Sequence, residues 1–210
     1  DSTIGDDSNS GPSPETPWKT LDKVTATTFL PGDTILLKSG SIWNGEWLWP
    51  KGSGTADAPI KIDKYGGDAL PVINGMGIDR GMNYSGAVHL RNQEYWEIRN
   101  LEVTNDDDFD VDIDLSRPQG DNSWSSQAET RNGILIIADG DLLNDGDDGI
   151  FDHIYIENCY VHDVDGPNDW NDTFTGGIIY NVVGTKIRPN TSFRDIRIAY
   201  NTIRKVDLLG

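Results

Sequence analysis

Residues 96–103 (WEIRNLEV), 154–161 (IYIENCYV) and 196–203 (IRIAYNTI) repeat one pattern three times, and this pattern decides the fold that we expect. In each copy an apolar residue stands two positions before an isoleucine, and a branched apolar residue follows that isoleucine five positions later. The spacing of two places side chains on one face of a β-strand, whereas the odd spacing requires a bend into a second strand. A bent strand pair that recurs along a chain is typical of a coil of a β-solenoid.

A further short strand accompanies each copy of this cassette. Residues 86–90 (GAVHL), 133–137 (GILII) and 177–180 (GIIY) each begin with glycine and precede one cassette. The chain also has 23 glycines and 10 prolines, which favour many turns and few long helices. We therefore predict an all-β protein, a parallel β-helix with three short strands in every coil.

The N-terminal segment has a different composition. Residues 1–16 are a polar, turn-rich lead-in, and Pro17 then stands at the first position of a predicted short helix. Trp18, Leu21 and Val24 recur at spacings of three, as on one face of a helix. We expect this helix to cap the first coil, where apolar surface would otherwise be exposed.

The charge of the chain limits the partners that it could bind. The 210 residues include 17 basic and 35 acidic side chains, a net charge of −18, so the surface repels nucleic acid. Acidic loops attract calcium, which takes carboxylate and carbonyl oxygens as ligands. The single cysteine, Cys159, has no partner for an internal disulfide, and no run of 18 apolar residues would cross a membrane. We expect neither a nucleic acid nor a membrane as partner.

Four segments carry a resemblance to a known superfamily: residues 5–11 (GDDSNSG), 31–35 (PGDTI), 54–60 (GTADAPI) and 95–103 (YWEIRNLEV). In this order they resemble the N-terminal half of secreted bacterial right-handed parallel β-helix proteins that act on carbohydrates. This superfamily includes pectate lyases, alginate lyases and several glycoside hydrolases. The resemblance implies a right-handed β-helix, a secreted, extracellular protein, and a polysaccharide or oligosaccharide as partner.

The resemblance also implies that more of the β-helix exists than this chain carries. The chain stops at Gly210, where the glycine strand of a further coil is expected. We therefore divide it into a lead-in, residues 1–16, and the N-terminal part of one β-helix domain, residues 17–210, incomplete at its C-terminus. A second polypeptide could complete the helix.

An acidic insertion follows the second glycine strand. Carboxylates alternate there with glycines, a composition typical of calcium loops, although Leu143 occupies a position that an EF-hand would give to an oxygen ligand. The alternative is an acidic surface that serves solubility. The predicted calcium ligands are Asp139, Asp141, Asp145 and Asp147.

The second cassette ends in the sequence that we regard as the candidate catalytic region. It joins a His-Asp pair to further carboxylates and to a tryptophan suited to stacking on a sugar ring. The predicted catalytic residues are Asp165, Asp169 and Asp172, followed by His162 and Asp163. Trp170 and Trp124 are the predicted substrate-binding residues. The alternative for His162 is a hydrogen-bonded structural role, and for the acids a role in substrate binding.

Three functions follow from these features. The first is a glycoside hydrolase with paired carboxylates, because few cations are present to bind uronates and a neutral glycan fits better. The second is a calcium-dependent polysaccharide lyase that acts by β-elimination on a uronate polymer. The third is a non-catalytic carbohydrate-binding fragment.

Overall fold

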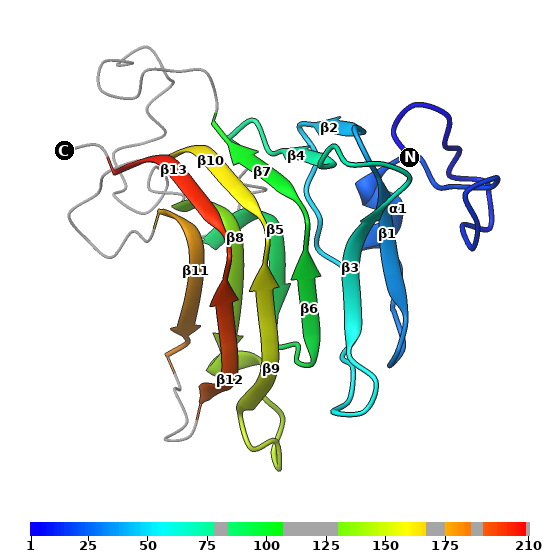
Figure 1. Ribbon diagram of the computed structural model, residues 1–210. Coiled ribbons are helices and arrows are strands. Elements are labelled where there is room, and N and C mark those ends of the chain that lie inside the picture. The colour runs from blue at the N-terminus through cyan, green and yellow to red at the C-terminus, as the bar shows by residue number, and fades with distance from the viewer. Residues whose placement is uncertain (78–83, 107–129, 167–174, 186–190, 209–210) are drawn as a thin grey trace, which may run out of the picture.

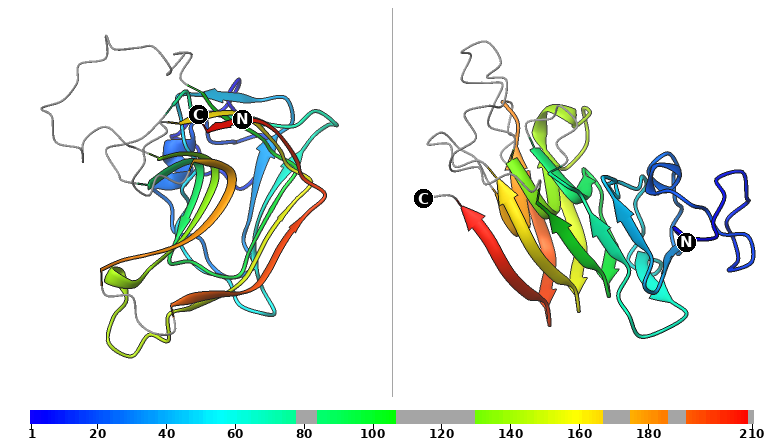
Figure 2. Two further views of the ribbon diagram at one scale, coloured as in Figure 1. Left: turned by 90° about the vertical axis from the view of Figure 1, so that its left-hand side faces the viewer. Right: turned by 90° about the horizontal axis from the view of Figure 1, so that it is seen from above.

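The computed structural model describes residues 1–77, 84–106, 130–166, 175–185 and 191–208. Parallel strands form three separate sheets, which surround a common interior when viewed end-on (Figures 1 and 2). The first sheet has the order β1 (Thr34–Lys38), β3 (Ile60–Tyr65), β6 (Trp96–Arg99), β9 (Ile150–Glu157), β12 (Ser192–Ala199). The second has the order β13 (Thr202–Leu208), β10 (Tyr160–Gly166), β7 (Glu102–Asn105), β4 (Val72–Asn74), β2 (Ile42–Asn44). The third has the order β11 (Gly176–Val183), β8 (Thr130–Asp139), β5 (Tyr84–Arg91).

The prediction of a single right-handed parallel β-helix with three strands in every coil is wrong. The strands lie in three sheets of unequal size, with five, five and three strands in the described part of the chain. On the N-terminal side of β5, the described residues add no further strand to the third sheet. Leu48 forms only an isolated parallel bridge with Val88 there. Pro50 follows closely and has no N–H group to continue a ladder, so no strand forms there.

The cassettes form the strand pairs that their spacing predicts. In the first sheet Trp96 pairs with Ile154, and Ile98 pairs with Ile156; all four side chains are fully buried. Each cassette bends at one residue with a left-handed backbone, with φ of 56° at Asn100, 55° at Asn158 and 59° at Tyr200. The bend carries the chain from the first sheet into the second.

The helix predicted after the lead-in is shorter than expected. Helix α1 (Leu21–Thr25) begins four residues after Pro17, because Thr20 is the N-cap and its hydroxyl accepts a hydrogen bond from the Lys23 backbone. Leu21 and Val24 are buried on its inner face. The only other helical element in the described ranges is the 3₁₀ turn η1 (Gly140–Leu142).

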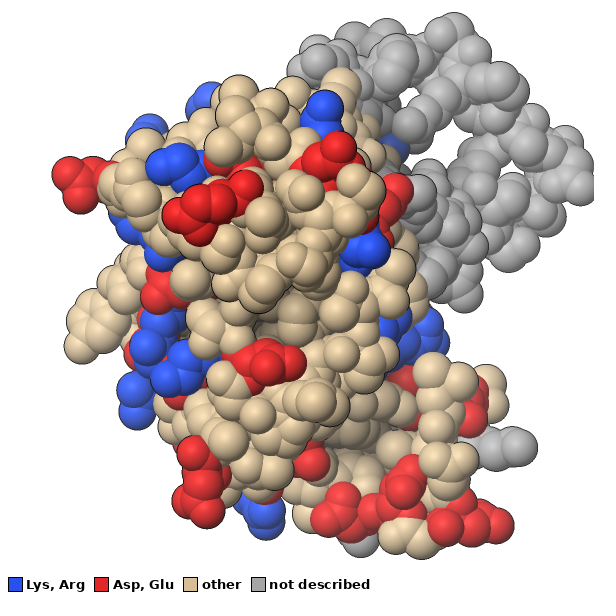
Figure 3. All heavy atoms as spheres, turned by 90° about the vertical axis from the view of Figure 1, so that its right-hand side faces the viewer, with Lys and Arg blue, Asp and Glu red and all other residues tan. Residues whose placement is uncertain are grey.

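Neither helical element of the described residues is long and apolar enough to cross a membrane. Charged side chains are dispersed on the face shown in Figure 3, where Asp and Glu lie among Lys and Arg. At the lower right of that face in Figure 3, Asp and Glu gather without Lys or Arg between them.

Candidate functional site

The second sheet delivers three connections to one edge of the molecule. The chain leaves β4, β7 and β10 at their carboxyl ends and enters β5, β8 and β11 of the third sheet. Parallel strands of one sheet end at the same edge, and ligands of parallel sheets bind preferentially at carboxyl ends. This corner between the second and third sheets is the candidate functional site.

Buried polar side chains line the inside of this corner. The amide nitrogen of Asn105 donates to the carbonyl of Asn132 at 3.1 Å, and the amide nitrogen of Asn132 donates to the carbonyl of Ser85 at 3.0 Å. Among the described residues, the side-chain oxygens of Asn132 and Thr175 have no hydrogen-bond partner although both residues are buried. We name this set the polar corner; its residues are Ser85, Asn105, Arg131, Asn132 and Thr175. Unpartnered buried acceptors are costly, so the polar corner is suited to a hydroxyl-bearing guest or ordered water.

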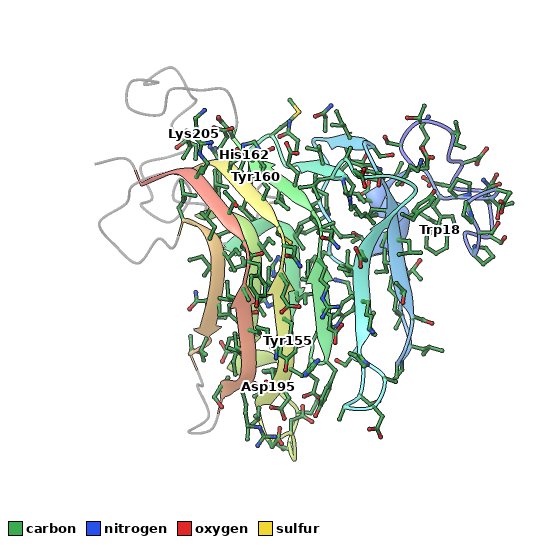
Figure 4. All side chains as sticks on the ribbon, viewed as in Figure 1. Trp18, Tyr155, Tyr160, His162, Asp195 and Lys205 are labelled. Atoms are coloured by element: carbon green, nitrogen blue, oxygen red, sulfur yellow. The ribbon has the colours of Figure 1, made fainter. Side chains whose placement is uncertain are left out.

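A second group of polar residues lies on the outer side of the same sheet. The imidazole of His162 lies between two carboxylates, with Nδ1 2.6 Å from Oδ2 of Asp163 and Nε2 3.2 Å from Oε1 of Glu102. The ring of Tyr160 stacks on His162 at a centroid distance of 4.0 Å. Nζ of Lys205 lies 3.1 Å from the other oxygen of Asp163 (Figure 4). We call these five residues the His162 cluster.

A bulge in β10 creates the His162 cluster. The pairing of β10 with β7 shifts between Val161 and Val164, and Asp163 has a left-handed φ of 46°. Lys205 on the neighbouring β13 has nearly the same φ, 47°, so the two irregular positions stack. The bulge adds one residue to the strand and brings the carboxylate of Asp163 against the ring of His162.

The electrostatics of the His162 cluster favour an ionised aspartate. Hydrogen bonding to His162, supported by Lys205, lowers the pKa of Asp163. An aspartate of this kind can stabilise positive charge or orient an imidazole, whereas a general acid requires a carboxyl group with a raised pKa. Burial raises the pKa of Glu46 and of Glu94, and neither belongs to this cluster.

The predicted catalytic residues are only partly described. His162 and Asp163 are in direct contact, and Asp165 lies further along β10, just after Val164, which pairs with Asn105 of the polar corner. The predicted residues Asp169, Asp172, Trp170 and Trp124 lie outside the described residues. Their catalytic and binding roles stay predictions.

The predicted calcium loop surrounds η1, and its carboxylates bind protein groups. Asp139 forms an ion pair with Arg91, and Asp141 accepts a hydrogen bond from the backbone of Thr185 at 2.8 Å. Asp147 accepts from the backbone of Asn144 at 2.7 Å, while Asp145 is exposed. Within the described ranges, no group of three or more His, Cys, Asp or Glu side chains is arranged to hold a metal ion. Calcium binding stays a prediction.

A polar cavity of about 440 Å³ lies beside this loop. Its walls include Glu94, Asn144, Asp147, Asp148 and Phe151. A second cavity of about 420 Å³ lies at the N-terminal end, where Trp18 and Phe29 contribute to the lining. Both volumes fall within the range of small-molecule pockets.

Several site residues have no place in the sequence-based prediction. Glu102 and Lys205 contact the His-Asp pair from other strands, and local spacing does not reveal such partners. The polar corner leaves a local signal, because a polar residue stands directly before a glycine in each of these three segments. The three dipeptides are Ser85-Gly86, Asn132-Gly133 and Thr175-Gly176.

No protein-family model matches the chain. A lacto-N-biosidase from Bifidobacterium longum subsp. longum is 31% identical over 252 aligned residues, which cover 100% of this chain and 15% of that protein. The selenomethionine structure of a GH136 lacto-N-biosidase from Eubacterium ramulus has a TM-score of 0.77 and 26% identity, over 97% of this chain and 33% of that one. The native structure of that enzyme gives the same TM-score with 25% identity, over 100% of this chain and 34% of that one.

The similarity extends along the whole chain in both sequence and structure. The chain itself spans 15% of the length of the Bifidobacterium protein and about a third of the Eubacterium structures. The comparisons support a relationship to carbohydrate-active enzymes.

Proposed function

We propose that this chain is part of a glycoside hydrolase that cleaves an extracellular glycan, with a lacto-N-biose unit as the recognised group. The observation that carries the proposal is the continuous similarity to lacto-N-biosidases, at 31% identity over the whole chain and a TM-score of 0.77. A similarity of this extent would not arise from one short motif. The activity belongs to the whole protein, to which this chain contributes one region.

The charge of the chain supports a neutral substrate. A net charge of −18 repels a uronate polymer, whereas neutral sugar hydroxyls can hydrogen-bond to carboxylates and amides. In this proposal the polar corner binds sugar hydroxyls through groups such as the amide oxygen of Asn132. The His162 cluster holds the carboxyl end of β10, and thereby Asp165, in a fixed position.

Hydrolysis requires two carboxyl groups with different roles. One donates a proton to the glycosidic oxygen, and the other acts as nucleophile or activates water. The candidates on this chain remain Asp165, Asp169 and Asp172. If the pair lies elsewhere in the whole protein, these acids bind the substrate instead.

Two further features belong to the same proposal. The protein acts outside the cell, where its glycan occurs, and calcium binds near the loop of residues 139–147. The acidic composition of that loop supports the calcium proposal, and hydrolysis by paired carboxylates does not depend on it. A rise in melting temperature on adding calcium, abolished by Asp141→Asn, would support it; no shift would overturn it.

The test is the reaction of the full-length protein with an aryl β-glycoside of lacto-N-biose. We expect release of the disaccharide without a product that absorbs near 235 nm. Absorbance at that wavelength from a uronate polymer would instead establish a lyase, and failure to cleave any glycan would overturn the proposal. Asp165→Asn and Asp169→Asn should each lower kcat about 100-fold or more if the residue transfers a proton. Asp57→Asn, at an exposed turn before β3, is the matched control and should leave kcat unchanged.

A further inference from the structure

The outer face of the first sheet presents an ordered set of side chains across three neighbouring strands. Trp96, Ile154 and Ile196 pair in one row of the sheet, so the residues just before them lie side by side. Those residues are Tyr95, His153 and Asp195. Two further rows of paired residues on the same strands also point outward. We name the whole set the first-sheet face; its members are Tyr95, Glu97, Arg99, His153, Tyr155, Glu157, Asp195 and Arg197.

The first row of this face is held in an unfavourable backbone conformation. Tyr95, His153 and Asp195 have φ values of 57°, 51° and 52°, and none of them is glycine. Such left-handed positions are uncommon for residues other than glycine and are concentrated at functional sites. Their side chains are in contact: the rings of Tyr95 and His153 stack at 6.0 Å, and Nδ1 of His153 lies 2.9 Å from Oδ2 of Asp195. The same left-handed conformation therefore recurs at three neighbouring positions, and the three side chains lie together on the outer face.

The second row is also fixed by contacts. The hydroxyl of Tyr155 donates to Asp195 at 2.9 Å, and the guanidinium of Arg197 lies 4.4 Å from the centre of the Tyr155 ring. Even so, the side chains of Asp195 and Arg197 are 54% and 53% exposed. They are thus ordered before any ligand arrives and remain open to solvent, which lowers the entropic cost of binding.

The charges of this face are balanced, in contrast to the rest of the chain. Lys61 pairs with Glu97 at 3.8 Å, and Arg99 pairs with Glu157 at 3.0 Å. Asp195 and Arg197 add one charge of each sign. Counting Lys61 of the adjoining β3, three cations oppose three anions here, whereas the whole chain has 17 basic and 35 acidic residues. A balanced face has no electrostatic preference for an ionic ligand.

We propose that the first-sheet face is a second carbohydrate-binding surface, which takes a neutral oligosaccharide across β6, β9 and β12. The hydroxyl of Tyr155, the carboxylate of Asp195 and the guanidinium of Arg197 can hydrogen-bond to sugar hydroxyls, and the balanced charge favours a neutral glycan. The surface lies on a different sheet from the polar corner and the His162 cluster (Figure 4). The ligand class rests on the proposed function, whereas the surface itself rests on the geometry above.

The test measures binding of the full-length protein to an immobilised, thio-linked neutral tetrasaccharide that ends in lacto-N-biose. Tyr95→Ala and Arg197→Ala should each lower the affinity of the first-sheet face for the tetrasaccharide at least tenfold. Tyr95→Phe should bind with the affinity of the wild type. Tyr65→Ala, at the end of β3 on the same sheet, is the matched aromatic control and should bind as the wild type does. Hydrolysis of the short aryl glycoside should be unchanged in all four variants. Melting curves show whether each variant is folded.

Each outcome distinguishes this surface from the proposed function. If Tyr95→Ala and Arg197→Ala bind as the wild type does while hydrolysis persists, the proposed binding surface is overturned and the proposed hydrolase activity is retained. If binding depends on these residues but nothing is hydrolysed, the hydrolase is overturned and the surface stands. Equal or tighter binding of tetragalacturonate would overturn the neutral ligand class.

Discussion

Strands β9 and β12 derive from the same sequence cassette but are held in the fold by different forces. Ile154 and Ile156 of β9 are fully buried, whereas the paired Ile196 and Ile198 of β12 are 40% and 49% exposed. The difference arises because β9 lies between β6 and β12, and in the described chain β12 pairs with β9 alone. Identical apolar patterns therefore contribute different free energies, according to the neighbour on each side.

Polar contacts on the outer side partly replace burial at β12. Arg194 forms a two-pronged ion pair with Asp152, and Asp195 contacts His153. Nη1 of Arg197 lies 3.4 Å from Oε1 of Glu157 on the neighbouring strand β9. The comparison thus predicts that inner strands depend on packing, whereas β12 depends more on charge.

The largest expected effect is a difference in stability loss between Ile156 of β9 and the equivalent Ile198 of β12. Ile156→Ala should lower the free energy of unfolding by about 2–5 kcal/mol, because it opens a cavity in a closed core. In the 210-residue chain Ile198→Ala is the matched control and should cost less than about 1 kcal/mol, since the side chain of Ile198 is 49% exposed there. Urea unfolding of both variants measures the difference. Equal losses would show that β12 is as well packed as β9.

Acid provides the second test, through a buried histidine on the face of the third sheet that points away from the main core. His89 is fully buried, its two ring nitrogens have no hydrogen-bond partner in the part of the chain that the structure describes, and the ring of Trp49 stacks on it at a centroid distance of 4.8 Å. Burial, with Arg91 and Lys51 nearby, lowers the pKa of His89 to about 3. The unfolded chain binds a proton near pH 6.5, so stability is fully present above that pH and falls as the pH drops toward 3.

Between pH 7 and pH 4.5 this histidine should remove about 3 kcal/mol of stability. Urea unfolding at the two pH values measures the loss. His89→Phe, which cannot bind a proton, should flatten the dependence over this range. An unchanged pH dependence in the variant would mean that His89 is accessible or paired in solution.

The smallest expected effect concerns the charges that hold β12. Arg194 lowers the pKa of Asp152, so the pair stabilises the fold above the ordinary aspartate range and stops doing so as the pH falls below it. Arg194→Ala should therefore lower the urea midpoint slightly at pH 7, and by less than Ile156→Ala does. The difference from the wild type should vanish at low pH or in 1 M salt, because protonation or screening removes the interaction. A loss that persists in salt would assign the effect to packing of the arginine stem.

The cassette strands could be predicted because alternation and turn residues act locally. The bends at Asn100 and Asn158 follow from the tolerance of asparagine for a left-handed backbone, and Tyr200 occupies the same position without that preference. The start of α1 was placed too early, because the predicted helix begins at Pro17 and the structure places the cap at Thr20. Residues 47–49 form only one isolated bridge to the third sheet instead of a further strand, which their apolar pattern does not reveal.

The candidate site was predictable only in part, for a related reason. His162 and Asp163 are neighbours in sequence, and their contact could be expected. Glu102 lies 60 residues from His162 and joins it only because β7 and β10 pair in register. The acidic loop illustrates the converse, since its carboxylates share a segment but bind separate donors such as Arg91 and Thr185.

Local patterns of apolar, glycine and asparagine residues were enough to establish parallel-sheet strands, their bends and their register. Burial, charge pairing and site composition depended on which strands became neighbours, because desolvation and Coulomb interactions act between residues that meet only after folding. For this reason one cassette forms a closed core at β9, and in the described residues the same pattern at β12 has a neighbouring strand on one side only.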